Sequence, residues 1–213
     1  MKKVIWSFSL LVMALFLSCR EDDADRFFSG QNDKLIINFS VQDPTSGLAT
    51  RSAIAPEAGE ENVKTLDLFF FESNSTGTGT FKGLKELIAT PENPLVMNTD
   101  MVFDFSDIGL SMTEPYDILI VANMGDNYLP TDGSQTLADW KSVIQRKNYK
   151  EAKAEIQVFM SGTDTNVPEY TTKPLESDAL LMSASLKKGK QDTKLKAVLQ
   201  RAVSRLSLIH ISE

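Results

Sequence analysis

The chemistry available to this chain is limited by one thiol and one imidazole. The 213-residue sequence contains a single cysteine, Cys19, and a single histidine, His210. A catalytic thiol needs a base partner, and a zinc site built from thiolates and imidazoles needs three or four ligands. The sequence therefore excludes a zinc site of this type and any intramolecular disulfide, and it leaves the position of Cys19 to be explained.

Two other segments have the composition of ligand-binding loops. Thr76–Thr80 reads TGTGT, which could approach a phosphate, but it lies between two expected strands and is better explained as a hairpin tip. Asp164–Asn166 has the spacing of calcium ligands, yet the glycine and the distal glutamate of a calcium loop are missing. No phosphate-binding, nucleophile-elbow or zinc-protease motif is present. We predict no enzyme activity, no cofactor and no metal.

The residues before Cys19 form a secretory leader. Two lysines precede Val4–Leu17, in which only two serines interrupt the apolar run. As a helix this run spans about 21 Å, which is shorter than the roughly 30 Å hydrocarbon core of a bilayer. Residues 1–18 are therefore predicted to be a signal peptide rather than a membrane-spanning helix.

The context of Cys19 resembles a bacterial lipobox, in which the thiol is acylated and becomes the mature N-terminus. Ser18 supplies the small residue before the thiol, although Phe16 and Leu17 are bulkier than most lipoboxes carry. Two or three acyl chains would hold the protein firmly on a membrane. We predict lipidation at Cys19 with palmitate or a similar acyl chain.

A polar tether, residues 19–33, is expected after the leader. Its start, Arg20–Asp23, resembles the signal that sends Bacteroidetes lipoproteins to the outer leaflet of the outer membrane, and it also fits a solvated acidic linker. The formal charge of the chain is −7 without a basic patch, which disfavours nucleic acid as a partner.

Alternating apolar residues predict strands in most of the remaining chain. The first strand, 34–42, has one apolar face, made of Leu35, Ile37, Phe39 and Val41. Residues 63–71 and 116–122 are apolar on both faces and are expected to be central strands. Residues 101–105 alternate again.

One helix is expected, with Thr136 as its N-cap and Asp139 three residues later. The segment 195–208 fits either a helix or a bulged strand, and the strand is favoured because its surroundings are β. The fold class predicted for residues 34–206 is mostly β, an antiparallel β-sandwich of about seven or more strands, Greek-key-like, with one short helix.

Several segments together resemble the fimbrillin family, the subunits and anchors of Bacteroidetes type V pili. Besides Cys19, they are LDLFFFES (66–73), YDILIVANMGD (116–126), LLMSA (180–184) and LQRAVSRLSL (199–208). Each is a short hydrophobic pattern, and the resemblance depends on their order and spacing over roughly 150 residues. It implies an N-terminal β-sandwich domain that is followed, in the family, by a second sandwich. The final stretch, SLIHISE (207–213), resembles a translated sequencing adapter, so a non-native tail on a truncated chain is expected.

The resemblance also implies a mechanism. A trypsin-like protease cuts fimbrillins after an arginine in the loop behind the first strand, and the counterpart here is Arg51 in LATRS. The cut would release the first strand, and a strand from another subunit could fill the groove. The implied partners are other fimbrial subunits, the outer membrane through the lipid, and host or bacterial surface ligands. The implied location is the outer membrane and the fimbrium. An anchor subunit is expected to remain uncut, and Arg51 could equally be an ordinary loop residue.

Two other function classes remain. A surface lipoprotein that binds glycans through a β-sandwich would need exposed aromatic side chains, and outside the leader Trp140 is the only tryptophan. A secreted hydrolase could use the many carboxylates, although no motif places any of them.

Overall fold

A computed structural model describes residues 33–42, 62–125, 128–129, 133–161 and 180–202. The chain divides into two units, Met1–Asp33 and Lys34–Glu213. The strands and helices in the described ranges all belong to the second unit. None of these helices is long and apolar enough to cross a membrane.

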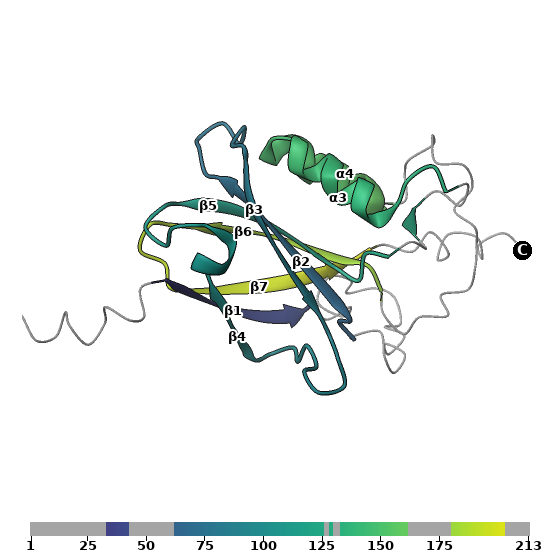
Figure 1. The fold of residues 1–213 in the computed structure, drawn as a ribbon, viewed down its shortest axis with the longest axis horizontal. Helices are drawn as coiled ribbons and strands as arrows, with labels where there is room; N and C mark the ends of the chain where they lie inside the picture. The colour runs from purple at the N-terminus through teal and green to yellow at the C-terminus, as the bar shows by residue number, and fades with distance from the viewer. Residues whose placement is uncertain (1–32, 43–61, 126–127, 130–132, 162–179, 203–213) are drawn as a thin grey trace, which may run out of the picture. The chain divides into compact units, whose positions relative to one another are not determined.

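Seven strands form one hydrogen-bonded sheet in the order β3-β2-β5-β6-β7-β1-β4 (Figure 1). Their bounds are β1 Lys34–Val41, β2 Thr65–Glu72, β3 Phe81–Ile88, β4 Asp100–Asp104, β5 Tyr116–Ala122, β6 Met182–Lys188 and β7 Lys194–Arg201. A short 3-10 helix, Ser106–Ile108, follows β4. All neighbouring strands are antiparallel except β1 and β7, which run parallel.

The sheet bends where β6 meets β7, and its two parts enclose an inner core. Strands β6 and β7 pair only at Met182↔Arg201 and Ser183↔Gln200, whereas β6 pairs with β5 along its whole length. The apolar faces of β1, β4 and β7 pack against those of β2 and β5 in a single cluster that includes Leu35, Phe70 and Ile118. Face-to-face packing of two parts of a sheet is the sandwich arrangement expected from the alternating sequence.

A helical layer covers the opposite face of β2 and β5 (Figure 1). Phe69 and Leu119 point toward it, and Trp140 and Ile144 of α3 (Leu137–Arg146) meet them, with an edge-to-face contact of 6.0 Å between the Phe69 and Trp140 rings. Strands covered on both faces need apolar residues on both, which explains why β2 and β5 carry apolar side chains on each face.

Helix α3 begins as the sequence predicts. The Thr136 hydroxyl accepts a hydrogen bond from the Asp139 backbone, and the Asp139 carboxylate accepts one from the Thr136 backbone, which completes a capping box. A second helix, α4 (Tyr149–Ser161), was not predicted. It opens with a similar reciprocal pair between Asn148 and Glu151.

The predicted fold class is confirmed as mostly β with seven strands among the described residues, and two details differ. The β1–β7 pair is parallel, and β1 lies beside β7 rather than beside β2, its neighbour in the sequence. A second helix is present. The ambiguous segment 195–208 is a strand through Arg201, and the part beyond residue 202 lies outside the described residues. Residues 76–80 lie in the loop of residues 73–80 that joins the antiparallel strands β2 and β3, as expected for a hairpin.

Candidate functional site

The two site residues predicted from the sequence, Cys19 and Arg51, lie outside the described residues. So do His210 and Asp164–Asn166. The structure does describe β1, the strand between the predicted lipid site and the predicted cleavage site, together with the strands that hold it. These elements are the candidate functional site.

Strand β1 is inserted between two strands that are not bonded to each other. On one edge it runs antiparallel to β4, from Lys34↔Asp104 to Asn38↔Asp100. On the other edge it runs parallel to β7, from Ile36↔Lys194 to Val41↔Leu199. Within the described part of the chain, β4 pairs with no strand except β1. Loss of β1 would therefore leave one open edge on β7 and would detach β4 from the sheet.

The buried face of β1 supplies a large share of its attachment. Leu35, Ile37 and Phe39 are completely buried, and the Phe39 ring meets the Phe103 ring of β4 edge-to-face at 6.1 Å. Val41, which the sequence assigned to the same face, is only partly buried. At about 1.5–3 kcal/mol for each fully buried apolar side chain, the three residues contribute roughly 5–9 kcal/mol of burial.

The outer face of β1 is joined to both neighbours by exposed polar contacts. The Asn38 amide donates to Asp100 of β4 at 3.0 Å, and Lys194 of β7 forms an ion pair with the same carboxylate at 2.6 Å. The hydrogen bond from Lys194, followed by that from Asn38, lowers the pKa of Asp100 below its ordinary value of 3.8. Because these groups are exposed, they fix the register of the strands more than they stabilise them.

Asn123, directly after β5, ties together the chain segments at one end of the sheet. Its amide nitrogen donates to the carbonyls of Asn62 and Leu180, each at 2.8 Å, and its oxygen accepts from the backbone of Lys64 at 2.7 Å and of Thr65 at 3.4 Å. Its φ of 61° is left-handed, a region that asparagine tolerates better than most residues. Asn123 thus holds the chain just after the 43–61 segment, which contains Arg51, to the body of the domain.

Lys188, at the end of β6, is a completely buried cation. Its ammonium donates to the backbone carbonyls of Met112, Glu114 and Gly189 at 2.5, 3.1 and 2.9 Å. It also lies over the rings of Phe105 and Tyr116, at 5.8 and 5.9 Å from their centres.

Burial lowers the pKa of Lys188. The ammonium of Lys188 is fully occupied by three carbonyls and two aromatic rings, so this lysine has a structural role and does not present a reactive amine.

A second buried charge joins the helical layer to the sheet. Asp67 of β2 forms an ion pair with Lys141 of α3 at 2.9 Å, and Lys141 also pairs with Glu86 of β3 at 2.5 Å. Burial raises the pKa of Asp67 despite the lysine. This pair orients α3 on the sheet. Among the described residues no three metal-ligating side chains come together.

Sequence reasoning missed Asn123, Lys188 and α4, although each has a sequence signal. Lys188 lies on the same face of β6 as Met182 and Leu186, because alternate residues of a strand share a face, whereas its exposed neighbour Lys187 lies on the other face. Asn123 stands between a buried strand and a glycine-containing turn, where a left-handed residue is common.

The chain matches no protein family model, and no curated protein matches it. It is similar to the crystal structure of a candidate cell adhesion protein from Parabacteroides distasonis, with 14% sequence identity and a TM-score of 0.39. The match covers 78% of this chain and 39% of that chain, so this chain spans well under half of the other protein's length.

Proposed function

We propose that this chain is a structural protein of a cell-surface fimbria, acting in adhesion as a subunit or an anchor and not as an enzyme. It is acylated at Cys19 and held on the outer membrane by that lipid. In a polymerising subunit, cleavage after Arg51 releases β1, and a strand from another subunit takes its place. In an anchor the cleavage does not occur and the lipid is retained.

The observation that supports this proposal is the placement of β1. The strand is first in the sequence of the domain, yet it pairs with β4 and β7 rather than with β2, the strand that follows it. One cut between β1 and β2 therefore separates the strand and everything before it from the other six strands. An incoming strand can pair with β7 and β4 and can bury apolar side chains where Leu35, Ile37 and Phe39 lie.

Asn123 fits this proposal because it anchors the chain on the far side of the predicted cut. After cleavage, the new N-terminal segment would remain attached through the carbonyl of Asn62 and the amides of Lys64 and Thr65. Release of β1 would remove this strand from the inner core and leave β4 without its partner, whereas the described contacts of the helical layer do not involve β1 or β4.

Limited trypsin digestion of the intact lipoprotein tests the proposal. The first cut should fall after Arg51, Arg51→Ala should abolish it, and Lys190→Ala in the exposed β6–β7 turn should leave it unchanged. Release of β1 from the cut protein under mild denaturant should produce oligomers, which Arg51→Ala should prevent. A first cut elsewhere, or oligomers that form equally well from the Arg51→Ala protein, would refute the proposed strand exchange.

A further inference from the structure

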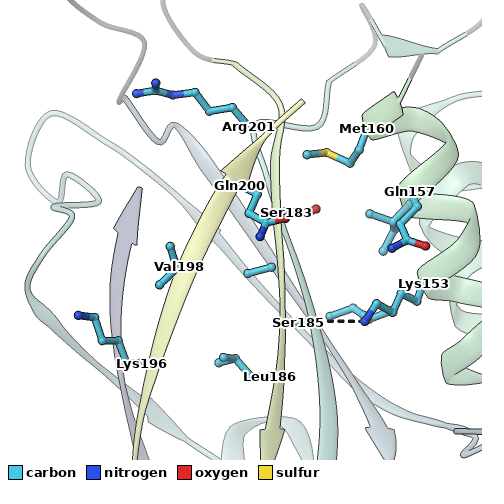
Figure 2. Close-up of a pocket in the computed structure, with 13 residues that line it drawn as sticks. Lys153, Gln157, Met160, Ser183, Ser185, Leu186, Lys196, Val198, Gln200 and Arg201 are labelled. Atoms are coloured by element: carbon cyan, nitrogen blue, oxygen red, sulfur yellow. Dashed lines mark hydrogen bonds between the residues drawn. The ribbon is translucent and has the colours of Figure 1, made fainter. Parts of the chain in front are cut away.

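A groove of about 730 Å³ opens on the helical side of the sheet, where β6 and β7 separate (Figure 2). Helix α4 forms one wall and the outer side of β7 forms the other. Figure 2 shows β6 and β7 meeting near Ser183 and Gln200 and diverging from there, and shows Lys153 reaching from α4 to Ser185. The Lys153 ammonium donates to the Ser185 hydroxyl at 3.3 Å.

The groove gives access to the edge of β6. Four consecutive residues of this strand, Ser183–Leu186, line it. Successive side chains of a strand point to opposite faces, so four in a row can line one cavity only where the cavity reaches the strand edge. Among the described residues, β6 has a strand partner on both sides only at Met182 and Ser183. In the part of the chain that the structure describes, its outer edge from Ala184 onward pairs with no strand and can accept a further one.

The side chains around the groove set its chemical preference. Leu119, Ile156 and Met160 supply apolar contacts, and Lys153 and Lys196 are cations on opposite walls. None of the described residues that line it is acidic and none is aromatic, although the chain as a whole carries a formal charge of −7. A positive groove on an acidic protein favours an anionic occupant. The missing aromatic rings disfavour a carbohydrate, which commonly stacks on them.

We propose that this groove binds an extended, acidic segment of a partner polypeptide, which adds a strand to the open edge of β6. Backbone pairing with Ala184–Lys188 supplies the attachment, and carboxylates of the partner face Lys153 and Lys196. This site is distinct from the exchange of β1, because β1 pairs with the edge of β7 that faces away from β6. It can therefore be occupied whether or not β1 is released.

Fluorescence polarisation of labelled peptides on the intact chain tests the proposal. The probe is a short peptide that alternates valine with aspartate, compared with its lysine counterpart and with a version methylated on alternate backbone amides. The acidic peptide should bind, and added salt should weaken it. The lysine and methylated peptides should bind at least about tenfold more weakly. Equal binding of either one, or no binding of the acidic peptide, would overturn the proposal.

Charge reversals locate the binding. Lys196→Glu should weaken the acidic peptide about tenfold, whereas Lys190→Glu, the same charge change in the β6–β7 turn outside the groove, should have little effect. Both lysines are exposed, so neither change should disturb folding. If the two variants weaken binding equally, the attraction is nonspecific. If an acidic polysaccharide binds in a Lys196-dependent way and the peptide does not, the groove is a carbohydrate site. Either result would refute the proposal.

Discussion

Replacing Asn123 by alanine should destabilise the domain strongly, because this one side chain joins three segments of the chain. It takes part in four hydrogen bonds with the backbone of Asn62, Lys64, Thr65 and Leu180. At about 0.5–1.5 kcal/mol net for each bond, the loss of the four amounts to roughly 2–6 kcal/mol. Alanine at a φ of 61° adds about 1–2 kcal/mol of backbone strain. The total loss in the free energy of unfolding should be about 3–8 kcal/mol.

Two control variants separate these contributions. Asn98 has the same φ of 61° but is exposed, so Asn98→Ala should lose only the backbone part, about 1–2 kcal/mol. Asn123→Gly removes the hydrogen bonds while relieving the strain, so it should lie between the two alanine variants. Urea unfolding followed by far-ultraviolet circular dichroism measures all three. If Asn123→Ala is no less stable than Asn98→Ala, Asn123 does not hold the segments together.

Three further changes probe the charged contacts. Lys188→Met leaves three backbone carbonyls without their donor and should lower the free energy of unfolding by about 2–4 kcal/mol. The control Lys187→Met should lower it by under about 0.5 kcal/mol, and equal losses would contradict the role of Lys188. Because the pKa of Asp100 is lowered in the folded state, its contribution to the free energy of unfolding is present above pH 3.8 and is lost as the pH falls through the folded-state pKa. Asp100→Asn should therefore make the free energy of unfolding fall less steeply at acid pH. An unchanged acid dependence would contradict the role of Asp100. Lys141→Met leaves Asp67 buried without its cation and should cost about 3 kcal/mol near neutral pH. Because burial raises the pKa of Asp67, this cost should shrink as the pH falls through that raised pKa and the carboxyl takes up a proton, and a cost that grows on acidification would contradict the role of Lys141.

Most of the β architecture could be predicted because burial imposes a period on the sequence. The alternation of Leu35, Ile37 and Phe39 defined β1, and the double-faced apolar runs of β2 and β5 indicated strands covered on both sides. The capping pair of Thr136 and Asp139 located α3. In each case the pattern of neighbouring residues reflects how those same residues are buried or capped, so one sequence is sufficient to predict the element.

The parts that escaped prediction depend on contacts between distant segments. The parallel β1–β7 pair joins residues more than 150 positions apart, and no local pattern encodes it. Helix α4 buries few side chains, mainly Ala152 and Ile156, so its apolar stripe is too sparse to detect. Lys188 belongs to a lysine-rich stretch that is typical of an exposed turn, and its burial depends on carbonyls about 75 residues away.

The candidate site could be predicted in part. The strand β1 and its buried face were identified from the sequence, and β4 and β7 were expected as strands, while the pairing of β1 with these two strands was not predicted. Acylation at Cys19 and cleavage after Arg51 remain predictions.

Strand complementation tests most directly whether β1 can be exchanged. The chain is cut after Arg51, the released segment is removed, and a synthetic peptide with the sequence of residues 33–42 is added. The peptide should restore the thermal unfolding midpoint of the uncut chain, because it again buries Leu35, Ile37 and Phe39 between β7 and β4. The same peptide with Ile37→Asp should fail, since it places a carboxylate in the inner core. If the stripped domain is as stable as the uncut chain, or if both peptides restore it equally, β1 is not an exchangeable strand.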